Sequence, residues 1–279
     1  MISAVIVNHN GGPILLQTLD RLARLGPVVS EVIVADNGST DGSRDDIKRR
    51  HRNVLLLELG RNLGFGPANN RAVAFARGEY VLLLNSDAWP APGALEKLEQ
   101  ALAKNLRLAL ACPLLFYPDG RPQFHWATST GLFGEAFQKL RNRWEKLPLV
   151  HRLPWPGGFY TAACVLVRKA AFDEIGGFDE RFFLYFEDVD LCLRLRRAGW
   201  KLRTVPEAKA FHIKGASQRL QEGDVMPGEL EYRRGQLAFY KKHRPAWELA
   251  WLRRHLKKKF LNREPGPGRD ALFELLGAP

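Results

Sequence analysis

The segment Tyr80-Val-Leu-Leu-Leu-Asn-Ser-Asp-Ala88 is the most informative part of this chain. Its apolar run predicts a fully buried strand, which Asn85-Ser86-Asp87 ends abruptly. An open α/β sheet binds its ligands beyond the carboxyl ends of such strands. Asp87 is therefore the first candidate metal ligand, although polar residues also end most strands for purely structural reasons.

Three earlier segments repeat this pattern. Residues 2–7, 31–35 and 54–59 read as buried strands, each followed by a cluster of polar residues and glycine. Helical leucine and alanine spacing lies between them, so the alternation predicts right-handed βαβ units and a mostly parallel sheet flanked by helices. The polar loops should share one edge of this α/β sheet, where we expect a nucleotide to bind.

Two common nucleotide-binding motifs are absent from the sequence. No Gly-x-Gly-x-x-Gly follows the first strand, and no Gly-x-x-x-x-Gly-Lys-Ser/Thr phosphate loop occurs anywhere. A dehydrogenase and a P-loop enzyme are therefore disfavoured.

The second half of the chain is less regular at first. Residues 113–156 are rich in Pro, Gly, Trp and Arg, which indicates a substrate-shaping insertion of long loops with a short basic helix near 137–147. Regular patterns then predict a strand at 162–167, a helix at 169–175, a helix that ends at Ala198 before Gly199, and a strand at 201–205.

Three carboxylates, Glu187, Asp188 and Asp190, crowd the first turn of the helix that ends at Ala198. Acidic residues favour a helix N-terminus, so a structural role explains any one of them. The aromatic run at 182–186 suggests a catalytic role instead, since burial and like charge raise a carboxyl pKa toward that of a working base. Asp188 is the candidate base, with Glu187 near the acceptor and Asp190 orienting a loop or the helix end.

Another polar cluster begins at His212. A lone histidine is more often a packing residue than a ligand, but Lys214 and Ser217 follow it with a glycine between. A cation, a close backbone approach and a hydroxyl together suit a diphosphate.

The C-terminal residues 229–279 form a basic helical extension with 12 Lys and Arg against 6 acids. Leu249, Leu252, Leu256 and Phe260 share one helix face, and cations occupy much of the rest. The helix either packs on the domain or lies on an anionic membrane, and Trp247 and Trp251 favour the membrane.

Composition limits the partners and the compartment. The net charge of +12 indicates anionic partners: nucleic acid, a membrane surface or phosphorylated substrates. Three scattered cysteines fit buried thiols in a cytosolic protein, and neither a signal peptide nor an apolar run of membrane-spanning length is expected. We therefore expect a cytoplasmic protein, either free or peripheral at the inner face of the membrane.

Six motifs together resemble the inverting glycosyltransferases of family 2, which have the GT-A fold, and most closely their rhamnosyltransferase-like branch. The similarity covers residues 2–217, and no single motif is specific alone. The motifs are Val5-Ile-Val-Asn-His-Asn10, Val34-Ala-Asp-Asn-Gly-Ser-Thr-Asp-Gly-Ser43, Asn62-Leu-Gly-Phe-Gly-Pro-Ala-Asn-Asn70, Leu82-Leu-Leu-Asn-Ser-Asp87, Gly176-Gly-Phe-Asp-Glu-Arg-Phe-Phe-Leu-Tyr-Phe-Glu-Asp-Val-Asp-Leu191 and His212-Ile-Lys-Gly-Ala-Ser217.

The resemblance implies a metal-dependent hexosyltransferase that moves a sugar from a nucleoside-diphosphate sugar to a glycan or lipid-linked acceptor in cell-surface polysaccharide or glycolipid synthesis. Residues 1–228 would form the GT-A domain, with a nucleotide-sugar half at 1–110 and an acceptor half at 111–228. Asp87 and His212 would bind Mn²⁺ or Mg²⁺, and Asp188 would be the base. Asn85 replaces the first aspartate of the family's Asp-x-Asp motif, where its carbonyl or a water can supply the oxygen. The remaining donor-site residues implied are Asn8 and Asp36 at the base, Asn37 nearby, Leu63, Gly64 and Asn69 along the nucleoside and sugar, and Lys214 at the diphosphate.

Three alternatives stay open. A nucleotidyltransferase of similar fold would release pyrophosphate, but the chain lacks an early glycine-rich phosphate loop that carries Arg or Lys. A retaining transferase would need a carboxylate beneath the anomeric carbon, which sequence does not exclude. A basic nucleic-acid-binding module is a non-enzymatic alternative, but we expect no nucleic acid, because the acidic clusters would repel its backbone.

Overall fold

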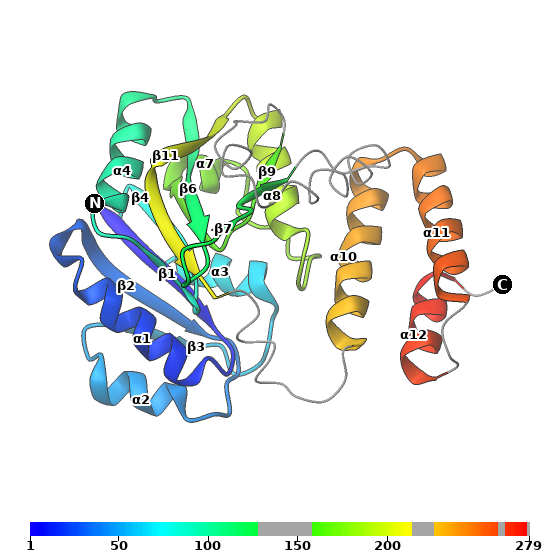
Figure 1. Cartoon of the computed structure of the whole chain (residues 1–279), viewed down its shortest axis with the longest axis horizontal. Helices are drawn as coiled ribbons and strands as arrows, with labels where there is room; N and C mark the ends of the chain where they lie inside the picture. The colour runs from blue at the N-terminus through cyan, green and yellow to red at the C-terminus, as the bar shows by residue number, and fades with distance from the viewer. Residues whose placement is uncertain (128–157, 214–225, 262–265, 278–279) are drawn as a thin grey trace.

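The computed structural model describes residues 1–127, 158–213, 226–261 and 266–277. A nine-stranded sheet forms the centre, in the order β3-β2-β1-β4-β10-β6-β11-β5, with β7 paired to β6. Helices cover both of its faces, and three C-terminal helices stand beyond one side (Figure 1). A small second sheet pairs β8 with β9.

The N-terminal half alternates strands and helices as the sequence predicts. Its elements are β1 (Ile2–Asn8), α1 (Gly12–Ala23), η1 (Gly26–Val28), β2 (Val29–Asp36), α2 (Ser43–Arg50), β3 (Leu55–Glu58), α3 (Phe65–Val73) and β4 (Tyr80–Asn85). All four strands run parallel. Register pairs Asn8 with Asp36 and Val7 with Asn85, so their polar ends meet at one edge, which confirms the expected arrangement.

The second half makes the sheet mixed. Its first elements are β5 (Ala88–Pro90), α4 (Ala94–Lys104), β6 (Leu108–Phe116), β7 (Pro122–Gln123), β8 (Trp126–Ala127), β9 (Phe159–Tyr160), β10 (Cys164–Arg168), α7 (Lys169–Glu174), α8 (Glu187–Arg197) and β11 (Lys201–His212). Strand β10 runs antiparallel to both β4 and β6. Strand β11 continues well past the predicted 201–205, through a register shift after Val205, and ends beside β5. The predicted basic helix at 137–147 lies outside the described residues.

Strand alternation divides the core into two layers. Ile2, Ala4 and Ile6 of β1 face the layer that contains α1 and α4, whereas Val5 faces the layer that contains α3 and α8. The strands bury both faces, which explains their almost continuous apolar sequence. Cys112, Cys164 and Cys192 are buried and free.

A third core joins the C-terminal helices to the loop before α8. These helices are α10 (Met226–His243), α11 (Ala246–Leu261) and α12 (Pro267–Leu275). Phe182 and Phe186 from the loop pack with Phe239 and Tyr240 of α10, and residues of α11 and α12 complete the cluster. The predicted helical extension is therefore present and contacts the segment that carries the candidate base. Within the described residues, no helix is long and apolar enough to cross a membrane.

Candidate active site

Asn8 ties the ends of β1 and β2 together. Its amide nitrogen lies 3.0 Å from a carboxylate oxygen of Asp36 and within 3.0 Å of the hydroxyls of Ser39 and Ser43. Its carbonyl accepts the backbone N–H of Gly11. Asn8 and Asp36 are almost fully buried, and every polar atom of Asn8 is engaged. Their contact with a nucleotide base stays a prediction. To bind a base, Asn8 would have to replace some of these hydrogen bonds with bonds to the base.

Asn37 connects the same edge to the loop after β3. Its carbonyl accepts the N–H of Leu63 at 2.8 Å, and its amide donates to the side chain of Asn62 and the carbonyl of Gly64. Asn69, on α3, is buried and donates to the carbonyl of Phe65 one turn earlier. The sequence-predicted residues Asn37, Leu63 and Gly64 are thus brought together, with Asn69 on the helix that follows.

Gly64 is where this loop meets the aromatic loop of residues 182–186. Its φ is +92°, and a Cβ atom there would lie 2.3 Å from the carbonyl oxygen of Phe183. The next residue, Phe65, donates its N–H to that same oxygen at 2.8 Å. Only glycine permits this backbone contact, which holds the predicted donor loop against the segment leading to α8.

A second cluster gathers where β5 pairs with the end of β11. This pairing sets His212 opposite Ala88, next to Asp87. The Nε2 atom of His212 lies 3.2 Å from an Asp87 carboxylate oxygen and 3.3 Å from the amide nitrogen of Asn85. Asp87 and His212 are both buried. The two predicted metal ligands therefore lie in contact, although 125 positions separate them in the chain.

Gln123, on β7, determines which nitrogen of His212 carries hydrogen. Its amide nitrogen donates to the backbone carbonyl of His212, so its oxygen is the atom 2.8 Å from Nδ1. That oxygen can only accept, which makes Nδ1 an N–H donor and leaves Nε2 as the nitrogen directed at Asp87 and Asn85. A cation between Nε2 and the carboxylate would be attracted to both.

These two side chains fit a divalent cation that also binds a diphosphate. Among the described residues, no group of three His, Cys, Asp or Glu side chains could hold a metal alone. Mg²⁺ commonly takes only one or two protein ligands and completes its shell with phosphate oxygens and water. The side-chain amide of Asn85 points its nitrogen at His212. This amide would have to rotate before its oxygen could bind the cation.

Asp188 and Glu187 begin α8 in a desolvated position. Burial raises the pKa of Asp188 to about 6, although hydrogen bonds from the backbone of Val189 and Ala162 oppose the shift. Burial and then the charge of Asp188 raise the pKa of Glu187 well above its usual range. The Oε2 atom of Glu187 is buried and has no hydrogen-bond partner among the described residues. This environment agrees with the predicted pKa shift, although for Asp188 desolvation is its main cause.

The backbone before these carboxylates is strained. Tyr185 and Phe186 have φ values of +68° and +69°, which residues with side chains rarely adopt. Helix α10 supports them: Tyr232 and Phe239 pack on Phe186, and Gly235 lets its helix backbone approach the carbonyl of Tyr185. The C-terminal extension thus helps to position the start of α8.

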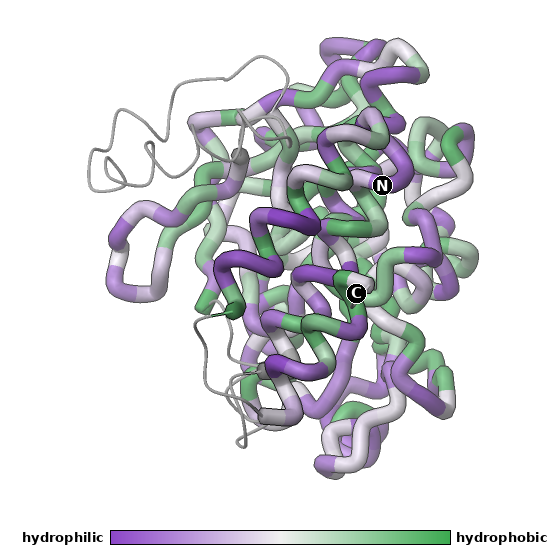
Figure 2. Tube along the Cα trace, turned by 90° about the vertical axis from the view of Figure 1, so that its right-hand side faces the viewer, coloured by the Kyte–Doolittle hydropathy of each residue, from purple (hydrophilic) through white to green (hydrophobic). Residues whose placement is uncertain are grey.

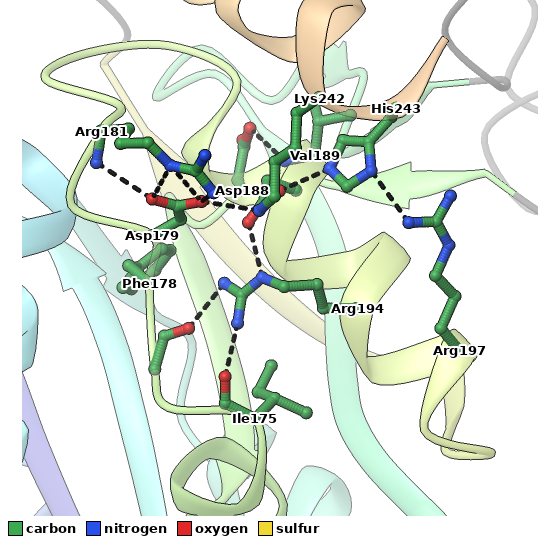
Figure 3. A network of polar contacts seen from close by, with 12 residues as sticks. Ile175, Phe178, Asp179, Arg181, Asp188, Val189, Arg194, Arg197, Lys242 and His243 are labelled. Carbon is green, nitrogen blue, oxygen red and sulfur yellow. Dashed lines mark hydrogen bonds and ion pairs between the residues drawn. The ribbon is translucent and has the colours of Figure 1, made fainter. Parts of the chain in front are cut away.

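Asp190 projects about 200° around the helix from Asp188 and anchors α8 to α10. Its carboxylate binds Lys242 Nζ at 2.5 Å, His243 Nε2 at 2.6 Å and Arg194 Nε at 2.6 Å. Figure 3 shows the side chains of Lys242, His243 and Arg194 pointing toward one another. Burial raises the pKa of Asp190, but these three partners outweigh it and hold the pKa below its usual range. Asp190 is therefore committed to ion pairs, in line with the orienting role expected for it.

Three further contacts extend this network. Lys242 also binds Asp179 at 2.6 Å, and Arg181 pairs with the same carboxylate. Arg197 donates to Nδ1 of His243, so the N–H of His243 is on Nε2 and points at Asp190, while burial lowers its pKa. Lys242 and His243 were not among the residues predicted from the sequence. In a helix rich in basic residues, the neighbouring sequence does not show which cation is buried.

Residues 3–176 match the family model described as glycosyl transferase family 2. The chain belongs to glycosyltransferase family 2. A relative from Mycobacterium tuberculosis, N-acetylglucosaminyl-diphospho-decaprenol L-rhamnosyltransferase, is 35% identical over 237 residues, which are 78% of this chain and 77% of that protein. Rhamnosyltransferase WbbL of Escherichia coli K12 is 26% identical over 231 residues, which are 76% and 83% of the two chains.

Solved glycosyltransferases share the fold, as expected for GT-A. A mannosyltransferase from Pyrobaculum calidifontis in complex with GDP-Man and Mn²⁺ gives a TM-score of 0.57 at 16% identity, over 99% of this chain and 84% of that one. GalNAc-T7 with UDP, GalNAc and Mn²⁺ gives 0.62 at 17% identity, over 99% and 55%. The predicted family and fold of this glycosyltransferase are confirmed.

The structure distributes the predicted site residues over three places. Asn8, Asp36, Asn37, Leu63, Gly64 and Asn69 lie around β1, β2 and α3; Asn85, Asp87 and His212 meet near β5; and Glu187, Asp188 and Asp190 begin α8. Lys214 and Ser217 lie outside the described residues. Gln123 was missed, although the turn Tyr117-Pro-Asp-Gly-Arg121 signals a hairpin that returns along β6.

Proposed function

We propose that this family 2 enzyme transfers a hexose from a nucleoside-diphosphate sugar to a hydroxyl of a lipid-linked glycan, with inversion, in cell-surface polysaccharide or glycolipid synthesis. The name of the Mycobacterium relative describes a rhamnosyltransferase whose acceptor is a sugar on decaprenol diphosphate. Its similarity over most of both chains supports a deoxyhexose donor and a lipid diphosphate acceptor here.

The observation that carries the proposal is the environment of Asp188. Its carboxylate has a pKa of about 6 because it is desolvated, so it is ionised yet basic at neutral pH. The loop before it is bonded to the donor loop at Phe65, next to Gly64. A base is thus attached to the segment expected to hold the sugar.

In the proposed reaction, the acceptor hydroxyl passes its proton to Asp188 as its oxygen attacks the anomeric carbon. The bond from that carbon to the diphosphate breaks on the opposite face, so the configuration inverts. Glu187, whose pKa burial raises well above its usual range, contacts the acceptor. Asp87 and His212 would hold Mn²⁺ or Mg²⁺, which when bound neutralises the departing diphosphate. Gln123 keeps the His212 lone pair directed at that position.

We further propose that the reaction takes place in the cytoplasm. Three free, buried cysteines support this compartment, because reduced thiols persist there. A lipid-linked acceptor would then be presented at the inner face of the membrane.

Product analysis tests the function directly. The purified protein is incubated with nucleotide sugars and a short-chain lipid diphosphate glycan, with EDTA or with added Mn²⁺. We expect nucleoside diphosphate release that needs both acceptor and metal, and an NMR spectrum of the product with the anomeric configuration opposite to the donor. Pyrophosphate release would favour a nucleotidyltransferase, and retained configuration would contradict the role of Asp188.

A further inference from the structure

Helix α11 uses its apolar face inside the protein. Leu252, Leu256 and Phe260 are at most 2% exposed and pack in the core shared with α10 and α12. The sequence left open whether this helix packs on the domain or lies on a membrane. Its leucine face packs on the protein, so only its other face is available to a membrane.

The opposite face of α11 presents two exposed tryptophans. Trp247 is 60% exposed and Trp251 is 47% exposed, and they lie one turn apart. Arg254 and Lys258 continue the same stripe at seven and eleven residues from Trp247, and both are exposed. The ring of His255 stacks on Trp251 at 4.9 Å and holds it at the surface. We name these four residues, Trp247, Trp251, Arg254 and Lys258, the outer stripe.

The charge around the outer stripe is positive. Helix α11 carries five Lys and Arg and one acid, Glu248, which is only half-exposed in the first turn. Within the described parts of the chain, no ion pair joins Arg253, Arg254 or Lys258 to a carboxylate. Figure 2, which faces this side of the molecule, shows hydrophilic and hydrophobic residues alternating along its helices.

We propose that the outer stripe docks on an anionic lipid bilayer. Indole rings favour the interface between lipid and water, and neighbouring cations are attracted to acidic headgroups. A straight 16-residue helix presents a line of about 24 Å, which suits a flat surface. The protein would lie on the membrane with α11 in the headgroup region and its leucine face still packed inside. This inference rests on the exposed face of α11 and does not depend on the transfer reaction.

Vesicle flotation tests the docking surface with the full chain. Deleting residues 229–279 is unsuitable, because it would also remove the ion pairs of Asp190 with Lys242 and His243. We compare vesicles of phosphatidylcholine alone with vesicles that also contain phosphatidylglycerol. Binding is expected only to the second, and weaker at high salt. The double variant Arg254→Gln/Lys258→Gln should bind roughly 25-fold less at low salt, since each cation contributes about fivefold before screening.

Exposed positions elsewhere supply matched controls. Phe75→Ala and Lys104→Glu remove an apolar and a basic side chain from the surface near the sheet and should partition like the wild type. Brominated phosphatidylglycerol should quench the wild-type fluorescence, and Trp247→Phe/Trp251→Phe should lose that quenching. Equal partitioning of outer-stripe and control variants, no binding to acidic vesicles, or displacement from them by a single-stranded oligonucleotide would overturn the proposal.

Discussion

Replacing Asp188 with asparagine is expected to stabilise the protein at neutral pH. A native carboxyl whose pKa is raised by burial binds its proton more tightly than the same group in the unfolded chain. The free energy of unfolding therefore falls as the pH rises from about 4 to about 6, and the loss persists above that range. Asparagine keeps the oxygen that accepts the Val189 N–H but carries no charge.

The size of this effect follows from the two pKa values. The shift from 3.8 to about 6 is worth about 3 kcal/mol at full desolvation, because one unit corresponds to about 1.4 kcal/mol. Asp188 keeps some solvent contact, so we expect Asp188→Asn to gain about 1–3 kcal/mol at pH 7.5 and almost nothing at pH 4.

Urea unfolding followed by circular dichroism across this pH range is the assay. Glu96→Gln, on the exposed side of α4, is the control for removing one carboxylate. If Asp188→Asn were no more stable than the wild type at pH 7.5, or equally stabilised at pH 4, then desolvation would not be the origin of the raised pKa.

Three further predictions concern residues around this pair. Gln123→Leu should weaken Mn²⁺ binding roughly 10–100-fold, as the loss of a side chain that orients a metal-binding histidine commonly does, and shift His212 away from the Nδ1–H tautomer in ¹⁵N NMR spectra; unchanged binding and tautomer would contradict its role. Lys242→Met should lower the free energy of unfolding by about 1–3 kcal/mol, because Asp179 and Asp190 lose their shared partner. An unchanged urea midpoint would show that these ion pairs do not hold α8 on α10. Gly64→Ala should cost at least about 1–3 kcal/mol and impair donor binding, since its Cβ would overlap the carbonyl of Phe183; a stable variant with normal donor affinity would disprove that close contact.

Sequence patterns predicted the parts of the site that depend on one strand or one helix. Asp87 was predicted as a metal ligand because an apolar strand ends there, and Asp188 as the base because acidic residues follow an aromatic run at a helix start. Periodicity reports such local features well, since it reflects which side of one element is buried.

The remaining features depend on contacts between distant segments. His212 reaches Asp87 because β11 continues past Val205 and pairs with β5, which no local pattern in either strand specifies. Gln123 becomes important only because β7 folds back on β6 beside His212. In α11 the leucine stripe was correctly predicted to be apolar, but periodicity does not distinguish a protein core from a lipid surface as its partner.

The most direct test of the central claim measures donor binding and sugar transfer in the same Asp188→Asn protein. Calorimetry with the donor nucleotide and Mn²⁺ gives the dissociation constant, and a rapid-quench single turnover with acceptor gives the transfer rate. If Asp188 is the base, donor affinity stays at the wild-type value while the transfer rate falls by roughly 10²–10⁴. Transfer within about threefold of the wild-type rate would contradict the assignment.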